Sequence, residues 1–88
     1  MPRYTIEVVV LPLPALLDPQ GEAIQQALHR LGETSIYTVR AGRAFHLLIE
    51  APSADAALST AQTAAQKHLH NPIVETYHLK LLTPHPSS

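Results

Sequence analysis

The chain has 88 residues, a formal net charge of -1 and no cysteine. This length is enough for one small domain, which buries so little surface that self-association is a common route to stability. Lys plus Arg number 6 and Asp plus Glu number 7, whereas nucleic acid and anionic membranes select basic surfaces. We therefore expect neither nucleic acid nor a membrane as a partner.

The lack of cysteine excludes disulfides and thiolate metal sites, and it fits a reducing compartment. The first residues run directly into a strand pattern without a signal-peptide layout. No apolar run approaches the ~20 residues that cross a bilayer as a helix. We expect a cytoplasmic protein.

The first expected element is a strand from Arg3 to Leu11. Apolar and polar residues alternate there and then become continuously apolar. Pro12 ends the strand because proline cannot donate to a sheet ladder.

A helix is expected next. Asp18 suits the N-cap and Pro19 suits the first helical position, while Gly32 is a typical C-terminal stop. One apolar stripe recurs with helical spacing between these signals. Its members are Ile24, Ala27, Leu28 and Leu31.

The following two segments predict an antiparallel hairpin. Residues 35–40 are rich in strand-forming residues, and residues 44–51 alternate in polarity. The short Ala41-Gly42 link between them is typical of a tight turn.

The last part of the chain predicts a helix and a strand. The second helix is alanine-rich, is capped by Ser53 and extends to about Leu69. Asn71-Pro72 ends it, and a strand is expected over residues 73–82.

This order of elements, βαββαβ, predicts a ferredoxin-like α+β fold: a four-stranded antiparallel sheet with two helices on one face. We expect a single domain over residues 1–82 and a flexible tail over residues 83–88. The face opposite the helices would carry apolar side chains, which predicts self-association through that face; isolated exposed aliphatics are the alternative explanation. These side chains are Val9, Leu11 and Leu48.

A search for catalytic groups finds no convergent set. The six histidines are scattered, while a metal site needs about three converging ligands. Glu7 and Glu50 could lie close together, but both suit half-exposed sheet positions. No phosphate-binding loop or nucleophile elbow is present, so we expect no catalytic residue and no metal site.

Two known uses of this fold require particular residues. RNA-recognition domains need stacking aromatics on the central strands, and the third predicted strand offers only Phe45. Regulatory domains of the ACT type share the strand order but usually have a glycine in the loop after the first strand. Residues 12–17 contain none. An ACT-like small-molecule-binding regulatory domain remains the alternative function.

Three segments together resemble one family. They are the Asp-Pro-Gln-Gly start of the first helix, the Val-Arg-Ala-Gly-Arg link, and Asn-Pro-Ile-Val-Glu before the last strand. In this order and spacing the chain is similar to the PurS family, the small subunit of phosphoribosylformylglycinamidine synthase. One departure is the segment 11–17, which lacks the lysine and glycine that the family often carries there.

The resemblance implies an ATP- and glutamine-dependent ligase of purine biosynthesis. In it a large synthetase subunit uses ATP and Mg, and a glutaminase subunit releases ammonia. The small subunit would be non-catalytic and bind no cofactor. It would form a homodimer or homotetramer, bridge the two larger subunits and aid ammonia transfer.

The candidate interface residues come from the three motifs. Most have a structural explanation as well, because Asp18-Pro19 forms a helix cap and Asn71-Pro72 a helix stop. Two arginines beside a turn could bind a carboxylate or phosphate bidentately, or be solvated. The full set is Asp18, Pro19, Gln20, Gly21, Arg40, Gly42, Arg43, Asn71 and Pro72.

Overall fold

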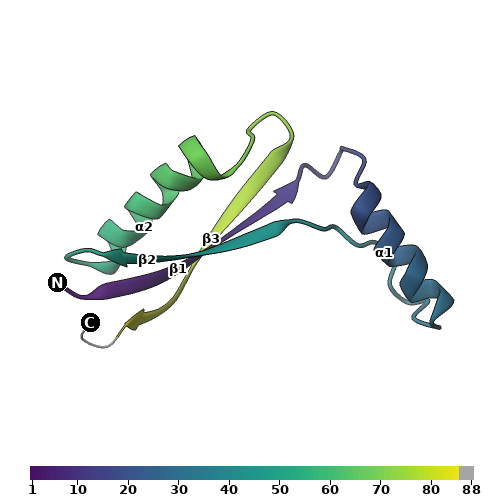
Figure 1. Ribbon diagram of the computed structural model, residues 1–88, viewed down its shortest axis with the longest axis horizontal. Coiled ribbons are helices and arrows are strands. Elements are labelled where there is room, and N and C mark those ends of the chain that lie inside the picture. The colour runs from purple at the N-terminus through teal and green to yellow at the C-terminus, as the bar shows by residue number, and fades with distance from the viewer. Residues whose placement is uncertain (86–88) are drawn as a thin grey trace.

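The computed structural model describes residues 1–85 and has an elongated shape of 50 × 29 × 14 Å (Figure 1). Three antiparallel strands form a sheet in the order β2-β1-β3 within these residues. One helix, α2, lies over one face of the sheet, whereas α1 projects away from its end. The elements are β1 (Arg3–Pro12), α1 (Pro19–Arg30), β2 (Arg43–Glu50), α2 (Ala54–Ala64), the π-helical turn η1 (Ala65–Leu69) and β3 (Glu75–His85).

The core lies between the central strand β1 and α2. Alternate residues of β1 point to one face, and Ile6, Val8 and Val10 are fully buried there. Ala57 and Ala61 of α2 are fully buried against Ile6, and Ala65 of η1 is fully buried against Val8 and Val10. Because alanine side chains are short, the helix backbone can approach the sheet closely. This face of the sheet is called the core face below.

Both helices start where their capping signals predict. The Asp18 carboxylate accepts a hydrogen bond from the Gly21 N–H, and the Ser53 hydroxyl accepts one from the Ala56 N–H. Gly32 has a positive φ of 96° just after α1, as a helix stop often does.

The prediction of a fourth strand was wrong for the described chain. Residue 35 lies in a turn and residues 36–40 have no regular secondary structure, so this range belongs to no sheet ladder of residues 1–85. The Ala41-Gly42 hairpin does not form either. A two-residue hairpin turn needs positive φ, which Gly42 does not adopt. The Ala41 N–H instead donates a hydrogen bond to the Asp18 carboxylate.

The prediction of two helices on one face was also wrong. Gly21 is the buried residue of α1, while Ile24 is 40% exposed and Leu31 is 79% exposed. The apolar stripe predicted from the sequence therefore exists on the helix, but the chain's own sheet does not cover it (Figure 1).

The last strand starts and ends later than the expected residues 73–82, because β3 begins at Glu75. β3 extends to His85, and its end pairs with the start of β1 at Arg3. Residues 86–88 of the expected tail lie outside the described residues. Neither α1 nor α2 has the length and apolarity that a bilayer crossing requires.

Candidate functional site

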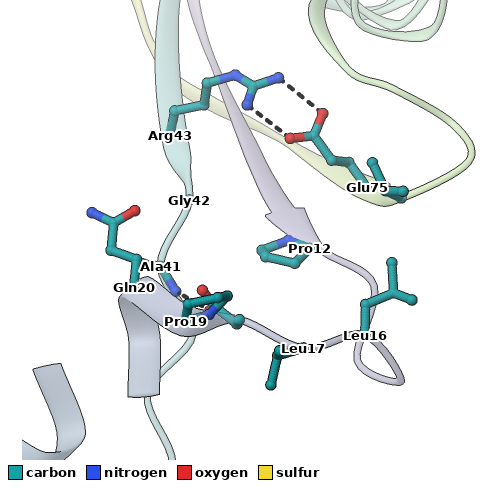
Figure 2. A pocket seen from close by; sticks show the side chains of 11 residues that line it. Pro12, Leu16, Leu17, Pro19, Gln20, Ala41, Gly42, Arg43 and Glu75 are labelled. Atoms are coloured by element: carbon teal, nitrogen blue, oxygen red, sulfur yellow. Dashed lines mark hydrogen bonds and ion pairs between the residues drawn. The ribbon is translucent and has the colours of Figure 1, made fainter. Parts of the chain in front are cut away.

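The three sequence motifs meet at one end of the sheet, where β1 ends and β2 and β3 begin. This region, called the junction below, contains an open pocket of about 870 Å³ (Figure 2). The start of α1, the link before β2 and the turn before β3 each contribute part of its lining. The lining residues are Pro12, Leu16, Leu17, Asp18, Pro19, Gln20, Ala41, Gly42, Arg43, Val74 and Glu75.

Asp18 ties the start of α1 to the link before β2. One carboxylate oxygen accepts from the Gly21 N–H at 3.0 Å and the other from the Ala41 N–H at 2.8 Å. These two backbone hydrogen bonds, that from Ala41 foremost, lower the pKa of Asp18 below its ordinary value. Arg40 adds a second tie, because its guanidinium donates to the Pro12 carbonyl.

Two glycines allow the backbone segments to approach each other at the junction. A Cβ at Gly21 would lie 2.2 Å from the Val39 carbonyl oxygen, and one at Gly42 would lie 2.0 Å from that of Val10. No side chain fits at either distance. The helix start and the β2 link therefore pack backbone to backbone.

Arg43 and Glu75 form the strongest side-chain contact of the junction. Two parallel hydrogen bonds of 2.7 and 2.9 Å join the guanidinium to the carboxylate (Figure 2). The guanidinium also donates to the Leu69 carbonyl at 3.2 Å. The pKa of Glu75 is lowered, first by Arg43 and then by the Asn71 backbone N–H. Arg43 is thus a structural ion-pair partner here.

Asn71 organises the turn before β3. Its side-chain oxygen accepts from the Ile73 N–H at 3.0 Å, and its carbonyl accepts from the Glu75 N–H at 2.8 Å. Glu75 in turn accepts from the Asn71 N–H at 2.8 Å. Glu75 lies in the third motif but is not one of the candidate interface residues; the sequence signal for its role is an acid four residues after Asn71 of the Asn-Pro helix stop.

The pocket wall is mostly apolar and partly open to solvent. Leu17 is 79% exposed and Leu16 is 43% exposed, and both line the pocket together with Pro12 at the β1 exit and Pro19 at the start of α1 (Figure 2). The charged groups around them are occupied by each other and by backbone groups. The junction is therefore better suited to packing against another protein surface than to acid–base chemistry.

Elsewhere, the two sheet carboxylates that could have lain close together each face a basic side chain, as expected of ordinary polar sheet positions. Glu7 does not lie opposite Glu50; it lies opposite His46, with 3.0 Å between carboxylate and ring nitrogen. Glu50 pairs in register with Arg3, at 4.0 Å. Within residues 1–85 no group of three His, Asp or Glu side chains is placed to hold a metal ion.

The proposed self-association residues occupy the face of the sheet opposite α2, called the open face below. Val9 alternates with the buried residues of β1 and is half-buried, as is Leu11. Leu48 is 53% exposed on β2. The sheet therefore separates this apolar set from the α2 side of the molecule.

The fold and the junction define a small α+β domain. Its three sequence motifs hold the junction together, and its exposed groups suit protein contacts. Residues 5–83 match the family model described as PurS: Phosphoribosylformylglycinamidine (FGAM) synthase. The Synechocystis sp. PurS subunit is 34% identical over 74 residues, which is 84% of this chain and 74% of that protein. The Bacillus subtilis PurS subunit is also 34% identical over 74 residues, covering 84% and 87%.

Solved structures agree with the sequence relatives. A chain of the PurLQS structure from Thermotoga maritima superposes with a TM-score of 0.85 at 29% identity, covering 93% of this chain and 100% of that one. The chain belongs to the PurS family, the small subunit of phosphoribosylformylglycinamidine synthase, a ligase of purine biosynthesis.

Proposed function

We propose that this chain is the non-catalytic subunit that bridges the glutaminase and the large synthetase subunit of phosphoribosylformylglycinamidine synthase. The observation that carries the proposal is the match to the PurS family over residues 5–83, together with a junction whose charged groups bind each other. A regulatory, ACT-like domain is not favoured, because the family model that matches residues 5–83 is that of PurS.

The junction is the proposed contact with the larger subunits. It offers exposed Leu16 and Leu17 beside a rigid frame of ion pair, cap and glycine contacts. A rigid apolar surface loses little conformational entropy on docking, which favours a stable interface. Ammonia released by the glutaminase is lost to water unless the subunits pack tightly. A bridging subunit would aid ammonia transfer by holding the glutaminase and the large subunit in a fixed relative position.

Three further points belong to the same proposal. The chain self-associates as a homodimer or homotetramer, with the open face around Val9, Leu11 and Leu48 as one contact. It binds no cofactor itself, and ATP with Mg is used by the large subunit. Its site of action is the cytoplasm.

Complex formation tests the bridging role. The large and glutaminase subunits of the same organism are mixed with and without the chain, with ATP, Mg and glutamine present, and run on a sizing column with mass detection. We expect a three-subunit complex only when the chain is present. Leu17→Glu should weaken it, whereas Gln62→Glu, an equal change in charge at an exposed site on α2, should not. A two-subunit complex that forms equally well without the chain would contradict the bridging role.

A further inference from the structure

One part of this chain projects from the sheet and is joined to it at a single place. This part consists of helix α1 and the segment that follows it (Figure 1). The Gln25 side chain donates to the Tyr37 carbonyl, and the His29 ring donates to the Ile36 carbonyl at 2.6 Å. Helix and segment therefore form one unit, residues 18–41, which is called the arm below.

Side-chain packing within the chain does not fix the direction of the arm. The apolar side chains that usually hold a helix against its sheet are open to solvent here. Ile24 is 40% exposed and Leu31 is 79% exposed. The direction of the arm relative to the sheet therefore depends on the contacts at its base.

Two charged side chains act at this base, and they have different roles. The Asp18 carboxylate accepts from the Ala41 N–H at 2.8 Å, so it joins the two ends of the arm to each other. Arg40 donates instead to the carbonyl of Pro12, which is the last residue of β1. Within residues 1–85 this is the one hydrogen bond that joins the arm to the sheet.

The backbone contact at Gly42 does not replace this hydrogen bond. A Cβ at Gly42 would lie 2.0 Å from the Val10 carbonyl oxygen, so the link lies against β1 at the point where the arm begins. A contact at the pivot itself fixes the position of the arm but leaves its direction free. Arg40 contacts a second segment, the exit of β1, and thereby restricts the rotation of the arm about this pivot.

A small rotation at the base moves the far end of the arm by several ångströms. Helix α1 has 12 residues, so it is about 18 Å long at about 1.5 Å per residue. A rotation of about 20° displaces the far end of such a helix by about 6 Å. By comparison, a misplacement of about 1 Å is enough to slow a reaction about 100-fold. Any subunit that packs on the arm would move with it.

We propose that Arg40 is a positioning residue for ammonia transfer in the ligase. Its hydrogen bond to the Pro12 carbonyl sets the direction of the arm relative to the sheet, and thereby the relative position of the subunits that the chain holds together. Without this bond the complex still forms, but ammonia released by the glutaminase escapes to water. The inference rests on the proposed function and adds the residue that controls the alignment of the subunits.

The ratio of product formed to glutamine hydrolysed tests the inference in the reconstituted three-subunit enzyme. Arg40→Met removes the donor and keeps a long side chain. We expect it to lower the ratio at least twofold, while the ammonium-dependent rate and the sizing profile stay unchanged. Arg40→Lys retains a charged donor of similar reach and should restore at least half of the lost ratio.

Arg30→Met is the matched control. Arg30 lies at the exposed end of α1 on the same arm, and the same loss of charge there should leave the ratio unchanged. Both arginines are exposed, so the two variants and the natural chain should have the same thermal unfolding midpoint. A change in the ratio at an unchanged midpoint separates positioning from a merely structural role.

The direction of the arm can be measured on the chain alone, because its sequence contains no cysteine. Spin labels on Gln26→Cys in α1 and Gln62→Cys in α2, both at exposed positions, report the distance between the arm and the sheet. Labelled chains are diluted with unlabelled chains so that each distance comes from one chain. We expect Arg40→Met to broaden the distance distribution at least twofold and Arg30→Met to leave it unchanged.

The outcomes separate this inference from the proposed function. An unchanged ratio for Arg40→Met in a complex that forms normally overturns the inference and leaves the bridging role standing. Equal falls in the ratio for Arg40→Met and Arg30→Met, or an unchanged distance distribution, also overturn it. Loss of the complex with Arg40→Met alone would make Arg40 a binding residue, which contradicts a positioning role. If the natural chain forms no complex, the proposed function fails, and Arg40 then has no subunits to align.

Discussion

The Arg43 guanidinium and the Glu75 carboxylate meet in two parallel hydrogen bonds of 2.7 and 2.9 Å across the end of the central strand. Arg43 starts β2 and pairs in register with Val10 of β1, while Glu75 starts β3 and pairs with Pro12. One ion pair thus links the two outer strands where β1 leaves the sheet. The planar guanidinium matches the carboxylate in a way that an ammonium group cannot.

Replacing this guanidinium by an ammonium should therefore weaken the junction. We expect Arg43→Lys to lower the thermal unfolding midpoint, because lysine loses one of the two parallel bonds and the contact with the Leu69 carbonyl. Arg30→Lys, at the exposed end of α1, is the control with the same chemistry. Equal midpoints for the two variants, measured by circular dichroism, would contradict a structural role for the pair.

The stability of the chain should fall in acid, partly through Asp18. Its pKa is lowered in the folded chain by the Ala41 and Gly21 N–H groups, so its contribution is present above the unfolded value of about 4 and lost as the pH falls below it. Glu75, lowered by Arg43, acts in the same direction.

Asp18→Asn isolates this effect. We expect the variant to have a lower urea midpoint at pH 7 and a smaller further loss between pH 5 and pH 3 than the natural chain. Glu33→Gln, an exposed carboxylate just after α1, removes the same charge and should keep the natural midpoint at pH 7. If the urea midpoint falls by the same amount between pH 5 and pH 3 in the Asp18→Asn and natural chains, the Asp18 carboxylate does not stabilise the folded chain through its hydrogen bonds to Gly21 and Ala41.

Core truncation should cost far more than surface truncation. Ile6 is fully buried against Ala57 and Ala61, so Ile6→Ala should lower the free energy of unfolding by about 2–5 kcal/mol. Ile73 is 79% exposed, and Ile73→Ala should change it by less than about 0.5 kcal/mol. Both changes in the free energy of unfolding are to be measured by urea denaturation at one protein concentration. Similar losses of unfolding free energy in the two variants would mean that Ile6 does not lie in the core.

The open face should contribute to self-association. Val9→Lys introduces a charge among Val9, Leu11 and Leu48, and sedimentation at micromolar concentration should show a smaller oligomer. Gln62→Lys, on the exposed side of α2, should leave the oligomer unchanged. If Val9→Lys keeps the natural assembly, this face remains exposed to solvent or serves the larger subunits.

Local signals predicted most of the individual elements. Asp18 and Ser53 cap helices as their residue types suggest, and the alternation in β1 placed Ile6, Val8 and Val10 on a buried face. The three motifs were recognised from residue types and spacing, and the structure brings them together at one junction.

The arrangement of the first helix and the following segment could not be predicted in the same way. The patterns of Ile24, Leu28 and Tyr37 indicate an apolar helix and a strand, but a periodic pattern does not specify which sheet covers it. The Arg43–Glu75 pair spans 32 residues in sequence and depends on strand register, which local patterns do not reveal.

The central claim is that this chain serves a larger ligase without a catalytic group of its own. The most direct measurement is the rate of formylglycinamidine ribonucleotide formation by the large and glutaminase subunits, with glutamine or with ammonium salt as nitrogen source, with and without the chain. We predict that the chain raises the glutamine-dependent rate strongly and the ammonium-dependent rate much less. A glutamine-dependent rate that is the same with and without the chain would contradict the account.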